Sequence, residues 1–105
     1  MRTEHKSTQI LLGLHVILDT VRHEVFVDDN PIEVTAKEYD LLCLLASHTG
    51  KIFTHEDLLK EVWGAEYFSE TNYLRVYINR LRRKLGPYGE DLIRTKPGMA
   101  YRIEL

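Results

Sequence analysis

With 105 residues, of which 44% are hydrophobic and 29% charged, the chain is long enough for one domain with a single core, and its composition excludes an intrinsically disordered protein. It contains no apolar run of the roughly 18 residues that a membrane-spanning helix needs. The lone Cys43 excludes an internal disulfide, and residues 1–9 lack the apolar segment of a secretory signal, so we expect a cytoplasmic protein.

The net charge of −2 is distributed unevenly along the chain. Residues 1–70 contain 6 Lys and Arg against 13 Asp and Glu, a net −7, whereas residues 71–105 contain 8 against 3, a net +5. A local cationic surface attracts phosphate within a Debye length of roughly 10 Å, whatever the total charge. The C-terminal third is therefore the candidate for a nucleic-acid-binding face.

The N-terminal third is predicted to form a small antiparallel sheet of three or four strands. Residues 1–9 are expected to be a disordered arm, and the domain to cover residues 10–105. Asp29–Asn30 is predicted to be a hairpin turn, because Asp and Asn tolerate positive φ, and Pro31 fits an edge strand. The predicted strands are the β-rich runs Ile10–Leu12, Val16–Asp19, Glu24–Val27 and Pro31–Val34.

A helix is predicted over Thr35–Thr49. Thr35 and Glu38 form a T-x-x-E capping box at its start, and Gly50 follows its end. Cys43 lies within this helix with no base beside it, so we expect it to fill space rather than to react.

A second, shorter helix is predicted to start at Thr54, with Asp57 at its N3 position, and to end at Gly64. The loop after it, Ala65–Glu70, is longer than the turn of a simple helix-turn-helix. Its aromatic residues are either half-buried props or a binding patch, and the sequence leaves both open. The side chains in question are Glu66, Tyr67, Phe68 and Glu70.

The long helix predicted over Asn72–Leu85 is the main functional candidate. Ser69 or Thr71 is expected to cap it, and Gly86–Pro87 to terminate it. Its apolar stripe, at helical spacing, consists of Leu74, Ile78, Leu81 and Leu85. The remaining faces carry five cations, two Asn and no acid, and a DNA major groove admits such a helix. A solvated amphipathic helix with ordinary surface charge remains the alternative.

Two short strands, Leu92–Thr95 and Ala100–Glu104, are predicted to follow a loop at Tyr88–Asp91 and to flank a turn at Lys96–Met99. This hairpin is cationic as well. A cationic helix followed by a cationic hairpin is typical of a winged helix, in which the helix enters the major groove and the wing contacts the flanking backbone. The predicted fold class is therefore α+β: a winged helix-turn-helix of three helices, with an N-terminal sheet and a C-terminal β-hairpin wing.

The sequence shows none of the common catalytic or metal-binding motifs. Its five histidines have no H-x-x-x-H pairing and no Cys partners, so no metal is expected. Neither a G-x-x-x-x-G-K-[ST] nor a G-x-G-x-x-G loop is present. We therefore expect no cofactor and no enzymatic activity.

Taken together, these motifs resemble the C-terminal effector domain of OmpR/PhoB-type response regulators. The resemblance covers roughly Ile10 to Leu105 and implies a sequence-specific, double-stranded-DNA-binding transcription regulator. It is carried by Val34-Thr35-Ala36-Lys37-Glu38 with Leu41-Leu42, by Gly50 and Val62-Trp63-Gly64, by Leu81-Arg82-Arg83-Lys84-Leu85, and by Gly98-Met99-Ala100-Tyr101-Arg102.

The resemblance assigns roles to individual positions. Pro97 stands where the family often has a minor-groove Arg, and Ala100 replaces a common glycine, so minor-groove contact by this wing would depend on Lys96. The loop residues Glu66, Tyr67, Phe68 and Glu70 match a segment that contacts RNA polymerase in some relatives. We also expect Arg83, Lys84 and Lys96 to contact DNA. The resemblance implies DNA contacts at Trp63, Asn72, Arg75, Val76, Asn79, Arg80, Arg82, Thr95 and Tyr101.

Within the family, Tyr73-Leu74-Arg75-Val76-Tyr77 looks most similar to the branch that regulates potassium-uptake (Kdp-type) genes. The resemblance further implies an upstream phosphorylatable receiver domain, a sensor kinase, and two copies bound head to tail on a direct repeat. The alternative from another class is a winged-helix protein-interaction module that docks a partner through its acidic half and Tyr67–Phe68. RNA binding is less favoured, because no exposed aromatic stacking platform is evident.

Overall fold

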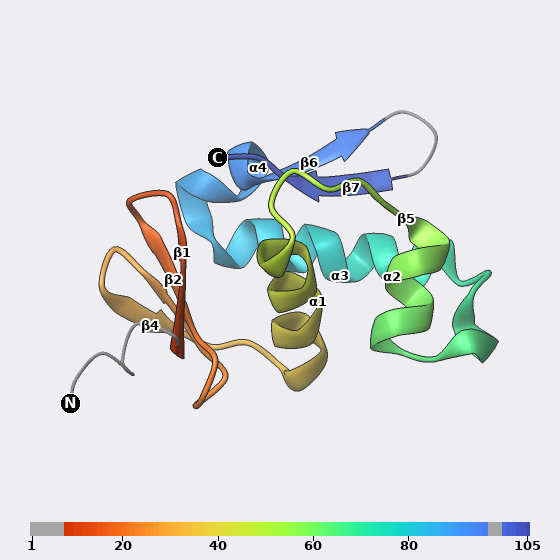
Figure 1. Ribbon diagram of the computed structural model, residues 1–105, viewed down its shortest axis with the longest axis horizontal. Coiled ribbons are helices and arrows are strands. Elements are labelled where there is room, and N and C mark those ends of the chain that lie inside the picture. The colour runs from red at the N-terminus through yellow and green to blue at the C-terminus, as the bar shows by residue number, and fades with distance from the viewer. Residues whose placement is uncertain (1–7, 97–99) are drawn as a thin grey trace.

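The computed structural model describes residues 8–96 and 100–105, in which two small antiparallel sheets flank a group of helices (Figure 1). The N-terminal sheet has four strands in the order β1-β2-β3-β4. Their bounds are β1 Gln9–Leu12, β2 Val16–Asp19, β3 Glu24–Val27 and β4 Asn30–Ile32. The prediction of an N-terminal antiparallel sheet is therefore confirmed.

Two details of this sheet differ from the prediction. The β3–β4 turn consists of Asp28 and Asp29, with φ of 50° and 68°, one residue earlier than predicted, because Asn30 already pairs with Val27 in the ladder. The sheet also begins at Gln9, a residue that we had assigned to the arm. Residues 1–7 of that arm lie outside the described residues. Pro31 does lie in an edge strand, as expected.

The first two helices are α1 (Ala36–Ser47) and α2 (His55–Val62), and both predicted capping boxes are present. The Glu38 amide donates to Thr35 Oγ1 at 3.2 Å, and the Asp57 amide donates to Thr54 Oγ1 at 3.1 Å. Local side-chain chemistry therefore sets both helix starts. Gly64, at φ 123°, ends α2 in a backbone conformation that L side chains rarely adopt.

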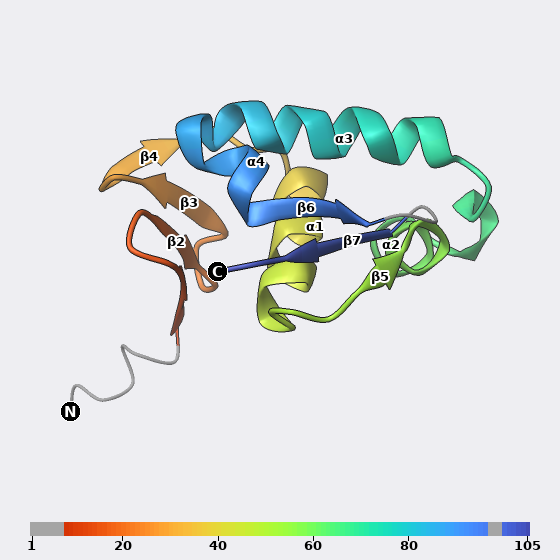
Figure 2. The ribbon, with the colours of Figure 1, turned by 90° about the horizontal axis from the view of Figure 1, so that it is seen from above.

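The long helix, α3 (Thr71–Lys84), runs across α1, and the wing lies beside it (Figure 2). Its predicted apolar stripe is fully buried at Leu74, Ile78, Leu81 and Leu85. Neither predicted cap is correct: the N-cap residue is Glu70, and no side chain caps the helix there. The preceding loop folds into a single 3₁₀ turn, η2 (Ala65–Tyr67), which delivers the chain to α3.

The chain after α3 contains structure that we had predicted as a loop. Gly86, at φ 67°, follows the helix end, and η3 (Gly86–Tyr88) and a short fourth helix, α4 (Gly89–Leu92), come next. Gly89 packs so closely on the α3 backbone that a Cβ there would collide with the Arg82 carbonyl. Glycine at this position therefore permits the tight turn that leads into the wing.

The wing strands β6 (Ile93–Lys96) and β7 (Ala100–Ile103) pair antiparallel, as predicted. An unpredicted two-residue strand, β5 (Phe53–Thr54), joins them in the order β5-β7-β6. The predicted Lys96–Met99 turn, including Pro97 and Gly98, falls largely outside the described residues. Because β5 immediately precedes α2, this sheet ties the wing to the start of that helix.

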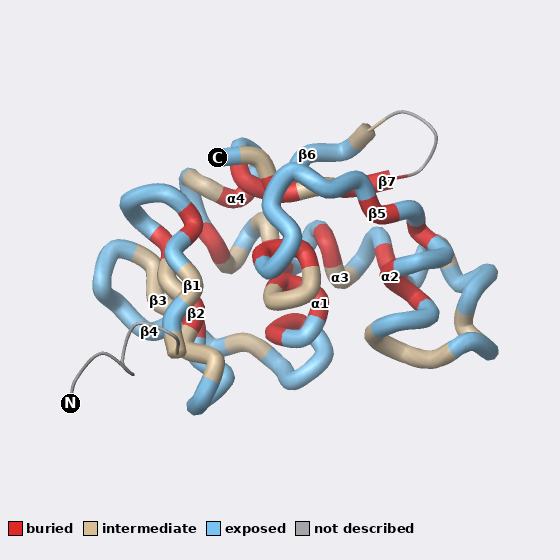
Figure 3. The backbone as a smooth tube through the Cα atoms, in the orientation of Figure 1, coloured by how far each residue is buried: buried red, intermediate tan, exposed pale blue. Residues whose placement is uncertain are grey.

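One hydrophobic core connects the two sheets and the helices, and Figure 3 marks the buried segments of these elements in red. It joins Leu12, Val16 and Leu18 of the N-terminal sheet to the buried faces of α1, α2 and α3. Within residues 8–96 and 100–105, none of the helices is long and apolar enough to cross a bilayer.

Candidate nucleic-acid interface

The face of α3 opposite its buried stripe is polar and cationic. Its exposed residues follow the helical spacing of one broad face: Asn72, Arg75, Val76, Asn79, Arg80 and Arg83. Val76 is 46% exposed, the apolar member of this set. Arg and Asn side chains are suited to bidentate contacts with guanine and adenine edges, and an apolar side chain is suited to a thymine methyl group. Burial of the opposite stripe in the core thus leaves six predicted DNA-contacting residues of α3 exposed to solvent.

An aromatic cluster lies at the N-terminal half of α3 and consists of Trp63, Tyr67, Tyr73 and Tyr77. The Trp63 ring centroid is 5.4 Å from that of Tyr73 and 4.9 Å from that of Tyr77. Tyr67 of the η2 loop stacks near Tyr73 at 6.2 Å. Trp63, predicted to approach phosphate, is therefore only partly exposed and also fixes α2 against α3.

Arg82, which the sequence predicts to contact DNA, is hydrogen-bonded to the wing in this structure. Its Nε and Nη2 atoms donate to the Ile93 carbonyl at 3.1 and 2.7 Å, and Nη2 also donates to Thr95 Oγ1 at 2.7 Å. The planar guanidinium of Arg, with several N–H donors in fixed directions, suits simultaneous hydrogen bonds to the Ile93 carbonyl and the Thr95 hydroxyl. Arg82 thereby fixes the first wing strand against α3, and Thr95 is an acceptor within the protein.

Lys84, also predicted to face DNA, is paired with a buried acid. Its Nζ atom lies 2.6 Å from Glu38 Oε1, and the Glu38 side chain is 1% exposed. Burial by itself would raise the pKa of Glu38. Hydrogen bonds from Lys84 and the Thr35 amide, with the charges of Lys84 and Arg80, hold that pKa below its ordinary value of 4.5. The pair therefore joins the end of α3 to the start of α1.

Tyr101 of the wing is 4% exposed because its ring is covered within the protein. It stacks on His55 with centroids 5.0 Å apart and an interplanar angle of 8°, and the Arg82 guanidinium lies 5.7 Å from its centroid. Burial raises the pKa of Tyr101, and burial together with the charge of Arg75 lowers that of His55. Both rings are thus neutral at neutral pH, at a junction of α2, α3 and β7 that the sequence did not indicate.

The remaining predicted residues lie in the wing and in the loop before α3. Lys96, at the end of β6, is partly exposed. In the loop before α3, Phe68 is 50% exposed and Glu66 and Glu70 are exposed, whereas Tyr67 is partly buried as a prop. Tyr67 and Phe68, which the sequence left undecided together, therefore have different environments.

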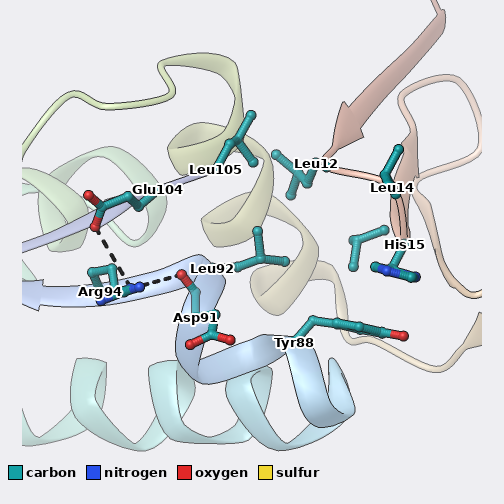
Figure 4. A pocket seen from close by; sticks show the side chains of 11 residues that line it. Leu12, Leu14, His15, Tyr88, Asp91, Leu92, Arg94, Glu104 and Leu105 are labelled. Carbon is teal, nitrogen blue, oxygen red and sulfur yellow. Dashed lines mark hydrogen bonds and ion pairs between the residues drawn. The ribbon is translucent and has the colours of Figure 1, made fainter.

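A hollow lies away from this face, between the β1–β2 turn and the C-terminal strand (Figure 4). Its volume is about 400 Å³, and apolar side chains such as Leu12, Leu92 and Leu105 line it. Arg94, predicted as a wing cation, donates to the Asp91 carbonyl beside it. Across residues 8–96 and 100–105, no group of three or more His, Cys, Asp or Glu is arranged to hold a metal ion.

Comparisons with known proteins agree with this geometry. The family described as "Transcriptional regulatory protein, C terminal" matches residues 29–103. The transcriptional regulatory protein SrrA of Staphylococcus aureus is 32% identical over 107 residues, covering 99% of this chain and 44% of SrrA. The chain therefore spans less than half the length of this curated relative.

Two solved structures are similar throughout. The DNA-binding domain of CpxR from E. coli superposes with a TM-score of 0.79 at 30% identity, covering 91% of this chain and 95% of that one. The DNA-binding domain of RstA from Klebsiella pneumoniae, solved in complex with the RstA box, gives a TM-score of 0.80 at 28% identity, covering 91% and 96%.

Proposed function

The chain belongs to the OmpR/PhoB-type family of transcriptional regulatory protein C-terminal domains, and from that membership we propose that it binds duplex DNA sequence-specifically to control transcription. Members of this family are response-regulator effector domains with a winged-helix fold, not enzymes. The observation that carries the proposal is the exposed Arg and Asn face of α3, held by a fully buried stripe on its other side.

We assign the contacts according to exposure and to the interactions that each side chain already makes within the protein. Base edges are contacted by the exposed residues Asn72, Arg75, Val76, Asn79 and Arg80, and phosphates by Arg83 and Lys96 with a peripheral contribution from Trp63. Arg82, Lys84, Thr95 and Tyr101 act mainly as braces, because their polar groups or rings are already engaged within the protein. Any phosphate contact by these four residues is secondary to that role.

The function of the whole regulator extends beyond this domain. SrrA is more than twice as long as the chain, which supports an upstream receiver domain addressed by a sensor kinase. We propose that two copies bind head to tail on a direct repeat, in the bacterial cytoplasm. The exposed Glu66, Phe68 and Glu70 of the loop before α3 are the proposed RNA polymerase contact.

The target genes are a finer proposal. The sequence Tyr73-Leu74-Arg75-Val76-Tyr77 is similar to that of the potassium-uptake (Kdp-type) branch. We therefore propose that potassium-transport genes are among the targets. The DNA motif found by selection can be searched for in promoter sequences. Its absence upstream of potassium-transport genes would reject this branch assignment.

The test of the function is selection from a randomised duplex pool at moderate salt, with sequencing of the bound fraction. We expect an enriched motif repeated at a spacing of about one helical turn, roughly 10 base pairs. Retention without enrichment would leave only non-specific DNA binding, which falls steeply with salt.

The rival function is a protein-interaction module. The partly exposed aromatic loop at Phe68 and the acidic N-terminal half are the features that favour it. An apolar interface shows little dependence of affinity on salt, whereas a DNA contact shows a steep one. Absence of any retention on DNA would move the assignment to this rival.

A further inference from the structure

Arg80 lies over the ring of Tyr77, its neighbour three residues earlier on α3. The guanidinium carbon is 5.4 Å from the ring centroid, within the range of an attractive cation–π contact. Residues three apart adjoin one another on a helix surface, so the contact follows from their spacing. Arg80 is otherwise exposed, and the ring restricts a side chain that would lose considerable rotamer freedom on binding.

The Tyr77 ring is itself held from two sides. Trp63 meets it edge-on at 4.9 Å and 76°, and Tyr73 meets it edge-on at 5.3 Å and 66°. Trp63 caps the end of α2, where its amide donates to the Leu59 carbonyl at 2.9 Å. A chain of contacts therefore runs from the end of α2 through Trp63 and Tyr77 to Arg80.

We propose that Tyr77 is a positioning residue that holds the Arg80 guanidinium in the orientation in which it contacts a base edge, with Trp63 as its support. This inference rests on the DNA-binding function proposed above and deepens it. A bidentate contact to guanine requires a fixed guanidinium plane. A side chain oriented before binding loses less entropy when the contact forms.

The ring contributes this effect, not the hydroxyl group. Burial raises the pKa of Tyr77, so the phenol is neutral at physiological pH and adds no charge near phosphate. Phenylalanine at this position keeps the aromatic face that attracts Arg80, whereas leucine keeps the apolar volume and loses that face. These two substitutions separate positioning from packing.

The experiment uses the whole chain and a duplex carrying its selected motif, in which each base pair is replaced in turn. Affinities are measured for Tyr77→Leu, Tyr77→Phe, Arg80→Ala and the double variant Tyr77→Leu/Arg80→Ala. Tyr67→Leu is the matched control, because Tyr67 belongs to the same aromatic cluster, with its ring 6.2 Å from that of Tyr73, but is not one of the two rings that meet Tyr77 edge-on. Thermal unfolding fixes an assay temperature at which every variant is folded.

We expect Arg80→Ala to relax the preference at one base-pair position by about 5- to 150-fold. Tyr77→Leu should relax the same position by about two- to fivefold and leave affinity for random duplex unchanged. It should have no further effect in the Arg80→Ala background. Tyr77→Phe should match the parent, and Tyr67→Leu should lose stability without losing the preference.

Equal loss at every position for Tyr77→Leu, or the same loss for Tyr67→Leu, would reduce Tyr77 to a packing residue and overturn the inference. Additive effects of Tyr77→Leu and Arg80→Ala in the double variant would overturn it too. If Arg80→Ala relaxes no position while the parent keeps its motif, the inference fails and the proposed function stands. If the parent shows no preference among duplexes, both fail.

Discussion

The cations of α3 carry the same charge in two different environments. Arg75 and Arg80 are exposed on the face opposite the core. Arg82 and Lys84 are partly buried, and each binds an acceptor of the same chain, in the wing and in α1 respectively. The exposed cations, Arg83 of the last turn included, are thus free to contact a partner, whereas Arg82 and Lys84 fix the helix in place.

The difference shows that residue type and helical spacing do not distinguish a contacting cation from a bracing one. Whether a cation contacts a partner or braces the fold depends on the hydrogen-bond acceptor or ring nearest to it within the protein. Lys84 lies beside a carboxylate that is 1% exposed and would be costly to leave unpaired. Arg80 has a ring beneath it and solvent on its other side, so its donors remain available.

The largest effect that would test this division is expected from Lys84→Ala. Because the substitution leaves the Glu38 carboxylate buried without its counter-ion, it should lower the free energy of unfolding by about 3 kcal/mol. Urea unfolding measures this loss. The double variant Glu38→Gln/Lys84→Met, which removes both charges, should recover most of it. Unchanged stability with uniformly weaker DNA binding would place Lys84 among the contacting cations.

Arg75→Ala tests the contacting part of the helix. Loss of a bidentate base contact should cost about 2 kcal/mol in binding to the selected motif and relax the preference at one position. Unfolding should change little, because Arg75 is exposed. Competition titrations with specific and random duplexes measure both affinities. Equal losses on the two duplexes would reject base contact by Arg75.

Arg82→Ala should affect the wing more than the helix. Its hydrogen bonds to the Ile93 carbonyl and Thr95 hydroxyl are lost, at a cost of about 1 to 2 kcal/mol in local stability. Hydrogen exchange should show this as faster exchange in β6 and β7 than in α1. Arg82→Lys should not restore protection, since a single ammonium cannot replace the fork. Unaltered exchange in the wing would make Arg82 a DNA contact after all.

A smaller effect is expected from acidification. The pKa of folded Glu38 lies below its ordinary value of 4.5, so the carboxylate stabilises the fold at neutral pH. That contribution is present above about pH 4.5 and is lost as the pH falls through the folded-state pKa. Urea unfolding at several pH values should show stability falling on acidification, with a shallower fall in Glu38→Gln. Identical pH profiles of stability for the parent and Glu38→Gln would exclude the Glu38–Lys84 pair as a source of the acid sensitivity.

The smallest effect belongs to Arg83, an exposed cation in the last turn. Arg83→Ala should weaken binding to all duplexes alike and reduce the slope of log affinity against log salt by about 1. Affinities at three or four salt concentrations give the slope. A base-specific loss would move Arg83 into the base-contacting group.

Features encoded by neighbouring residues were predictable from the sequence. Thr35 with Glu38 and Thr54 with Asp57 set the helix starts locally, and the stripe from Leu74 to Leu85 defined the buried face of α3. The structure confirms these assignments. It also shows the winged-helix arrangement that they predicted.

Features that depend on distant partners were not predictable. The two residues of β5 form a strand because β7 pairs with them, 46 residues later for Thr54 and Ala100. Lys84 meets Glu38 across 46 residues, and Arg82 meets Ile93 across 11. Helix α4 was predicted as a loop because Gly86 and Pro87 terminate a helix locally, and nothing nearby indicates that another turn follows.

The most direct test of the division within α3 is a crystal structure of the domain bound to its selected duplex. We predict Arg75, Asn79 and Arg80 within hydrogen-bonding distance of base edges, with Arg82 still donating to the Ile93 carbonyl and Lys84 still paired with Glu38. Arg82 and Lys84 released from these acceptors and bound to phosphates, with the exposed face turned away from the groove, would contradict the account.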